Sequence, residues 1–133
     1  MDMIGDRWSL ILIRDMMFLD KRRYSEFLAS NEGISTNILA SRLKQLQQLE
    51  FVEKFADPDS AKTAIYLLTD RGLSLYPLML EVLRWGRRIN NDARISSEVA
   101  AALANDGEPL ARAVERRTRA ERNRLSSPMQ AAF

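Results

Sequence analysis

Four polar side chains recur at helical spacing between residues 35 and 49. They are Asn37, Ser41, Lys44 and Gln48, at positions i, i+4, i+7 and i+11, which share one face of a helix. An amide offers the paired donor and acceptor that fit adenine N6 and N7, and an ammonium group suits guanine or a phosphate. The segment contains no Asp or Glu. Such a face could therefore approach a polyanion and bind base edges.

The opposite face of the same helix is apolar. Leu39, Leu43 and Leu46 form a narrow stripe that must face a core. Ser35 is a preferred N-cap, and Ile34 with Leu39 forms a hydrophobic staple that sets the entry angle of the helix. Uncharged polar faces also occur on ordinary solvated helices. The elements around this helix therefore decide between the two interpretations.

Two helices are expected before it. Asp6 is suited to cap a helix over residues 8–19, which is apolar nearly all round and is therefore a central helix. A basic turn follows, and then a short helix over residues 24–30. Gly33 lies in the next turn, where it can adopt a positive φ.

Two strands and a long helix are expected after it. A period of two predicts strands over residues 52–56 and 63–68, joined as a hairpin with a polar tip. Thr69 would cap a helix over residues 70–90, in which Pro77 either causes a kink or opens the second half. This helix has more apolar surface than one small core needs, so we expect a second subunit to cover part of it. The residues assigned to this dimer interface are Trp8, Leu73, Tyr76, Leu80, Leu83 and Trp85.

The remaining chain differs in composition. Residues 95–111 contain three acidic residues and no basic one, whereas residues 112–124 contain six arginines and two glutamates. Helices are expected over residues 97–105 and 109–125, with limited packing, and the end from Ser126 is expected to be disordered. The arginines could follow a DNA backbone or close over a dimer, or the segment could be a solvated appendage. The sequence leaves these alternatives open.

The composition excludes most enzyme chemistry. The chain has 133 residues, 46% of them hydrophobic, which suits one domain with a sizeable core. Without Cys or His there is no disulfide, zinc cluster, redox switch or ordinary catalytic triad, so we expect no enzyme activity, no cofactor and no metal. No signal peptide or membrane span is recognisable, and a cytoplasmic protein is expected. The net charge is only +2, so DNA binding would depend on where charges lie.

The order of these elements is that of a winged helix-turn-helix, mainly α with a small β-hairpin wing. In this arrangement the third helix enters the major groove and the wing lies against an adjacent groove or phosphates. We therefore predict a dimeric winged helix-turn-helix domain over residues 1–92, and a helical, Arg-rich extension with a disordered end over residues 93–133. The candidate DNA-binding residues are Thr36, Asn37, Ser41, Lys44, Gln48, Arg42, Arg22, Arg23, Lys54 and Lys62.

Several of these residues have a second interpretation. Arg22 and Arg23 could bind phosphates or belong to a solvated turn, and Arg42 could be a structural ion pair or a phosphate clamp. Asp57 and Asp59, near the tip of the wing, would repel DNA. The alternative function is a winged-helix module that binds a protein through the outer face of its third helix.

Residues 4–86 resemble the HxlR-type winged-helix transcriptional regulators of bacteria and archaea, relatives of the MarR group. The matching stretches include Arg-Tyr-Ser-Glu-Phe-Leu at 23–28, Leu-Ala-Ser-Arg-Leu-Lys-Gln-Leu at 39–46 and Tyr-Leu-Leu-Thr-Asp-Arg-Gly at 66–72. The resemblance implies a homodimer on an inverted-repeat operator, with the first and the post-wing helices at the dimer contact. It implies DNA contacts at Thr36, Asn37, Ser41 and Lys44, supported by Arg23 and the wing.

The chain departs from the family pattern in three places. It lacks the cysteine through which many members sense oxidants, so thiol sensing is excluded. Leu49-Glu50-Phe51 stand where the family usually has a Gly after the third helix, so the positive-φ helix stop must be made by a non-Gly residue or avoided, and the wing lacks a Pro-rich tip. An unidentified small-molecule effector could bind near Trp8, Tyr76 and Trp85, although aromatic side chains at helical spacing more often belong to a core.

Overall fold

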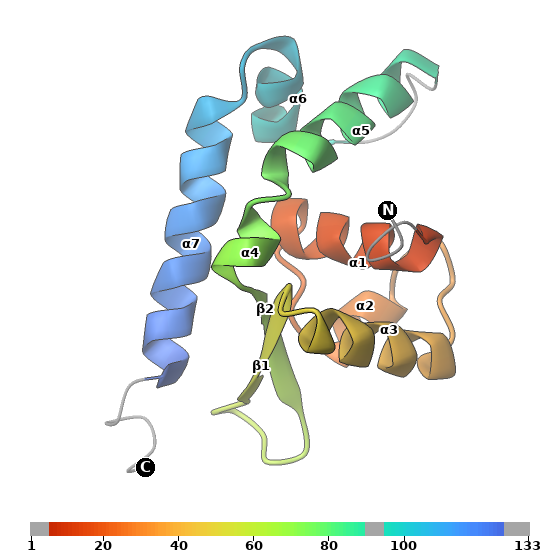
Figure 1. Ribbon diagram of the computed structural model, residues 1–133, viewed down its shortest axis with the longest axis vertical. Helices are drawn as coiled ribbons and strands as arrows, with labels where there is room; N and C mark the ends of the chain where they lie inside the picture. Colours follow the sequence, from red (N-terminus) through yellow and green to blue (C-terminus); the bar gives the residue numbers. More distant parts are fainter. Residues whose placement is uncertain (1–5, 90–94, 127–133) are drawn as a thin grey trace.

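The structure is a computed structural model that describes residues 6–89 and 95–126, and Figure 1 shows its arrangement. Helices and a two-stranded antiparallel sheet follow one another along the chain. In order, the elements are α1 (Arg7–Phe18), α2 (Tyr24–Leu28), α3 (Thr36–Gln48), β1 (Val52–Ala56), β2 (Ala64–Leu68), α4 (Asp70–Leu73), α5 (Tyr76–Ile89), α6 (Ser97–Ala104) and α7 (Glu108–Ser126). The predicted helix-helix-helix-hairpin-helix order is confirmed.

Helix α1 lies at the centre of the fold, as its apolar sequence predicts. Leu12, Ile13 and Met17 are at most 1% exposed, with α2 and α3 on one side of the helix and α5 on the other (Figure 1). The Asp6 side chain caps α1 by accepting hydrogen bonds from the backbone N–H groups of Trp8 and Ser9. The cap fixes the start of the helix against which the rest of the domain packs.

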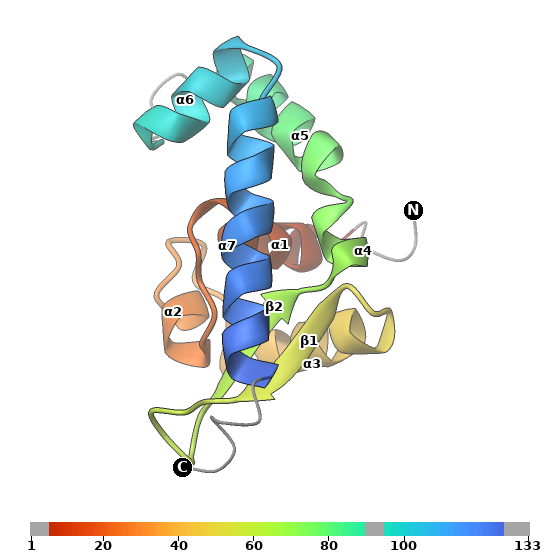
Figure 2. The ribbon, with the colours of Figure 1, turned by 90° about the vertical axis from the view of Figure 1, so that its left-hand side faces the viewer.

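The wing is an antiparallel pair in which Val52 lies opposite Leu68 and Ala56 opposite Ala64. Strand β2 is buried at four successive positions, Ile65 to Leu68, rather than at alternate ones. The reason is that β2 packs against α1 while α7 contacts both strands (Figure 2). A strand that is buried on both faces has a continuous run of apolar residues in its sequence.

The long helix expected over residues 70–90 is two helices. Helix α4 ends at Leu73 and α5 begins at Tyr76, so Pro77 occupies the first turn of α5 and opens the second half. This position suits proline because the N–H groups of the first turn have no partner within the helix. The break changes the direction of the chain, as Figure 1 shows.

Helix α3 ends with Glu50 in the left-handed region, at φ 64°. The N–H of Phe51 donates to the carbonyl of Leu46 and that of Glu50 to the carbonyl of Gln47, which is the hydrogen-bond pattern of a Schellman motif. A positive φ strains every residue that has a Cβ. Glu50→Gly should therefore raise the free energy of unfolding by about 1 kcal/mol, measured by urea denaturation. Unchanged or lower stability would show that the Glu50 side chain relieves this strain.

The C-terminal helices pack against the rest of the fold more closely than the thin apolar stripe of residues 109–125 predicted. Val114 is 1% exposed, and the phenol of Tyr76 donates to the Gly107 carbonyl at 2.8 Å. Nη2 of Arg117 donates to the carbonyl of Met17, at the end of α1, also at 2.8 Å. Since arginines donate to carbonyls that helix and strand ends leave open, a helix with few apolar residues can still pack firmly.

In the described part of the chain, no helix combines the length and the apolar character needed to cross a membrane.

Candidate nucleic-acid interface

Helix α3 is held by its inner face and its cap. Leu39, Leu43 and Leu46 are at most 1% exposed, and they belong to the same core as Phe27 of α2. The Ser35 hydroxyl accepts a hydrogen bond from the N–H of Ile38 at 3.2 Å. These contacts fix both the rotation and the start of the helix, so the opposite face has a defined direction.

The outer face of α3 consists of the polar residues singled out above. Thr36, Asn37, Ser41, Lys44 and Gln48 are all exposed. Among residues 6–89 and 95–126, no carboxylate forms an ion pair with Lys44. The face therefore offers hydrogen-bond donors and acceptors and one positive charge to an incoming molecule, which is the condition that base contact requires.

Arg42 lies at the edge of this face and is held by its own chain. Its Nε donates to Oδ1 of Asp6 at 3.0 Å, and its Nη1 donates to the Ser41 hydroxyl at 3.3 Å. Partial burial acts to raise the pKa of Asp6, but hydrogen bonds from Ser9 and Arg42 outweigh it and lower the pKa. Arg42 thus ties α3 to the start of α1 through an ionised carboxylate.

The two arginines of the basic turn also face carboxylates. Arg22 donates to Asp20 through Nε and Nη2, and its Nη1 lies 2.8 Å from Oε1 of Glu121 on α7. Nε of Arg23 lies 2.8 Å from Oδ2 of Asp57. In the free chain the charges of both arginines are therefore already paired. Their role as DNA-binding residues stays a prediction.

The connection between the two strands of the wing carries one neutralised acid, Asp57, and one exposed acid, Asp59. Asp57 is buried and accepts hydrogen bonds from Arg23, from the Thr63 hydroxyl and from the Asp59 N–H, which together hold its pKa well below the usual range. The expected repulsion of DNA by the tip therefore falls mainly on Asp59, which is 82% exposed. Both predicted wing cations, Lys54 and Lys62, are exposed.

The residues assigned to a dimer interface fall into three groups by burial. Tyr76 and Leu80 are buried within the chain, where Gly107 closes over them, so the first turns of α5 pack against the α6–α7 connection. Trp8, Leu73 and Leu83 are half-buried. Trp85 is 65% exposed.

An apolar stripe on α5 contains two residues missing from the predicted interface. Leu78 and Val82 are each 42% exposed and lie at i and i+4 before Trp85 at i+7, on one face of the helix. The spacing alone could have found this stripe. What it could not tell is that the neighbouring Tyr76 and Leu80 pack inward.

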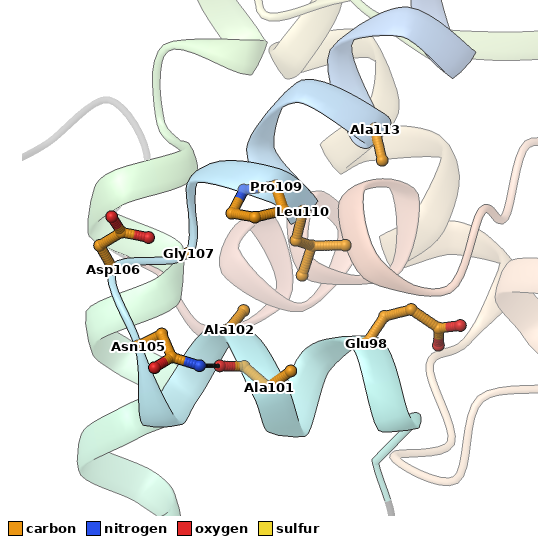
Figure 3. A pocket seen from close by; sticks show the side chains of 9 residues that line it. All are labelled: Glu98, Ala101, Ala102, Asn105, Asp106, Gly107, Pro109, Leu110 and Ala113. Atoms are coloured by element: carbon orange, nitrogen blue, oxygen red, sulfur yellow. Dashed lines mark hydrogen bonds between the residues drawn. The ribbon is translucent and has the colours of Figure 1, made fainter.

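An apolar hollow of about 620 Å³ lies between α6 and α7. Figure 3 shows its walls, made by Ala101 and Ala102 on one helix and Pro109, Leu110 and Ala113 on the other. Trp8, Tyr76 and Trp85 do not line it. The expected effector site near those aromatic residues stays a prediction.

The fold and this face of α3 together define a winged helix-turn-helix protein. The HxlR-like helix-turn-helix family matches residues 3–94, and the chain belongs to that family. The resemblance inferred from the sequence is thus confirmed.

Similar proteins agree with this assignment. The chain is 35% identical over 83 residues to the HTH-type transcriptional regulator YodB of Bacillus subtilis (strain 168), covering 62% of this chain and 73% of YodB. It is 30% identical over 86 residues to an uncharacterized HTH-type transcriptional regulator of Mycobacterium tuberculosis (strain CDC 1551 / Oshkosh), but spans only 53% of that relative. These relatives are described as regulators and not as enzymes.

Solved structures resemble the fold. The redox regulator HypR in its oxidized form matches with a TM-score of 0.58 and 28% identity, over 65% of this chain and 89% of HypR. MarR matches with a TM-score of 0.52 and 21% identity, over 92% of this chain and 82% of MarR. The second match shows likeness of fold alone, and it extends beyond the residues that the family covers.

Proposed function

We propose that this chain is a sequence-specific, DNA-binding transcriptional regulator. The observation that carries the proposal is the outer face of α3, which is exposed, free of carboxylates and set on a buried apolar face within a winged helix. Asn37 and Gln48 can each make a two-hydrogen-bond contact with adenine, and Lys44 can donate to guanine O6 and N7. Membership of a helix-turn-helix family with regulator relatives supports the same function.

We further propose that the regulator acts as a homodimer on an inverted repeat. The exposed stripe of Leu78, Val82 and Trp85 on α5 offers an apolar surface that a second copy would cover. A two-fold axis through such a contact would present the two α3 helices to half-sites about 34–36 Å apart, one turn of the DNA helix. The symmetry of the protein then requires the two half-sites to be inverted.

Selection from a random pool of duplex DNA tests this function. We expect enrichment of an inverted repeat, and binding of the enriched duplex should weaken linearly with log salt, with a slope of about −0.9 for each phosphate neutralised. Sedimentation of the complex should give two chains per duplex. A pool without enrichment, together with capture of a protein through α3, would favour the protein-interaction module instead.

A further inference from the structure

The end of α7 lies beside the wing, outside the residues that the family matches. Figures 1 and 2 both place it there, and α7 contacts β1 and β2. In this region Arg22 and Arg124 share one carboxylate, that of Glu121. Arg124 donates to both oxygens of Glu121, at 3.0 and 2.6 Å, and Arg22 approaches Oε1 at 2.8 Å. We call these three residues the wing-side cluster.

The two arginines of the cluster differ in how many of their guanidinium nitrogens are already paired. Arg22 is 24% exposed and uses all three of its nitrogens on Asp20 and Glu121. Arg124 is 43% exposed, and its Nη1 has no partner among the described residues. Arg124 is therefore the member that can bind a further anion.

Glu121 keeps its negative charge in this setting. Hydrogen bonds from Arg124, and beyond them the charge of Arg22, lower the pKa of Glu121 despite its burial. The charges of Asp59 and Arg23 also act on Arg124. The guanidinium of Arg124 is thus within electrostatic reach of Asp59 at the tip of the wing and of Arg23, which pairs with Asp57.

The wing of a winged helix lies along the DNA backbone or an adjacent groove when its recognition helix is in the major groove. A guanidinium is well suited to a phosphate because its planar N–H groups match the phosphate oxygens. We propose that Arg124, which Glu121 partly neutralises in the free chain, binds a phosphate of the DNA backbone beside the wing. The inference rests on the proposed DNA binding and assigns a role in it to the C-terminal extension.

Substitution of Arg124 in the full chain tests the contact, with the enriched duplex and an unrelated duplex as probes. Because phosphates carry no sequence information, Arg124→Ala should weaken binding to both duplexes by the same factor, about 3–10-fold, and reduce the salt slope by about 1. Arg112→Ala, on the exposed first turns of α7 away from the wing, is the matched control and should leave both quantities unchanged. Equal results for the two variants would overturn the proposal.

Two further variants separate a phosphate contact from mere support of α7. Arg124→Lys keeps the charge but loses the two-bond pairing with Glu121, so a phosphate contact predicts that most affinity is retained. Glu121→Gln removes the competing charge and should raise the affinity about 2–5-fold relative to Glu115→Gln, which adds the same net charge elsewhere on α7. Loosening of the helix cannot raise affinity, so a loss in Glu121→Gln would contradict the proposal.

DNA-binding measurements on the wild-type chain and on Lys44→Glu separate failure of this inference from failure of the proposed function. If the wild type binds the enriched duplex and Lys44→Glu does not, the proposed function stands whatever Arg124→Ala does. If the wild type binds no duplex, the proposed function itself fails.

Discussion

Lys44→Glu should weaken binding of the enriched duplex by about 100-fold or more. The substitution removes a donor to guanine or phosphate and places a carboxylate against a polyanion, and like charges juxtaposed at an interface cost several kcal/mol. Lys44 is exposed and no described residue forms an ion pair with it, so the change should leave the fold intact. Fluorescence anisotropy with labelled duplex measures the affinity, and circular dichroism checks the fold.

A matched charge reversal on another helix controls for the loss of net positive charge. Arg112 is 64% exposed, and within residues 6–89 and 95–126 its one ion-pair partner is Glu108, at 3.8 Å. Arg112→Glu changes the net charge equally, and we expect a loss of affinity below about threefold because exposed charges beyond a Debye length are screened. If Lys44→Glu binds as well as Arg112→Glu does, α3 is not the DNA-reading helix.

Gly72→Ala should lower the free energy of unfolding by about 2–3 kcal/mol. Gly72 lies in α4, directly against the start of the wing. A Cβ at this position would come within 2.3 Å of the Phe51 carbonyl oxygen and 3.0 Å of Leu68 Cδ2. The same carbonyl accepts the N–H of Thr69 at 3.1 Å, so it cannot move away without loss of a hydrogen bond. Urea denaturation at a fixed protein concentration measures the difference.

A second helical glycine supplies the control. Gly86 lies in α5, and a Cβ built there meets nothing within 4 Å. Gly86→Ala should therefore raise the free energy of unfolding by about 0.5–1 kcal/mol, because alanine has the better helix propensity. The two substitutions are chemically identical, so opposite signs would assign the Gly72 effect to the close approach. If both substitutions raise the free energy of unfolding, the predicted steric conflict at Gly72 is refuted.

Local pattern sufficed for the elements of the winged helix and for the two faces of α3. The apolar stripe of Leu39, Leu43 and Leu46 has a helical period, and burying it necessarily exposes Asn37 and Lys44 on the other side. The caps Asp6, Ser35 and Thr69 were readable for the same reason, since a cap acts over three residues. Interactions of this kind are short-range, and a single sequence displays them directly.

The sequence did not show which residues far apart in the chain form ion pairs and hydrogen bonds with one another. The pairing of Arg22 with Glu121, of Arg23 with Asp57 and of Tyr76 with Gly107 joins residues whose separation carries no periodic signal. An arginine in the sequence shows that a positive charge is present, but only the packing of α7 against the wing decides whether a carboxylate of the same chain neutralises it. The sequence by itself therefore determined which helix presents a polar face without carboxylates, whereas the tertiary structure decided which cations are already paired, because ion pairing depends on distances that folding alone creates.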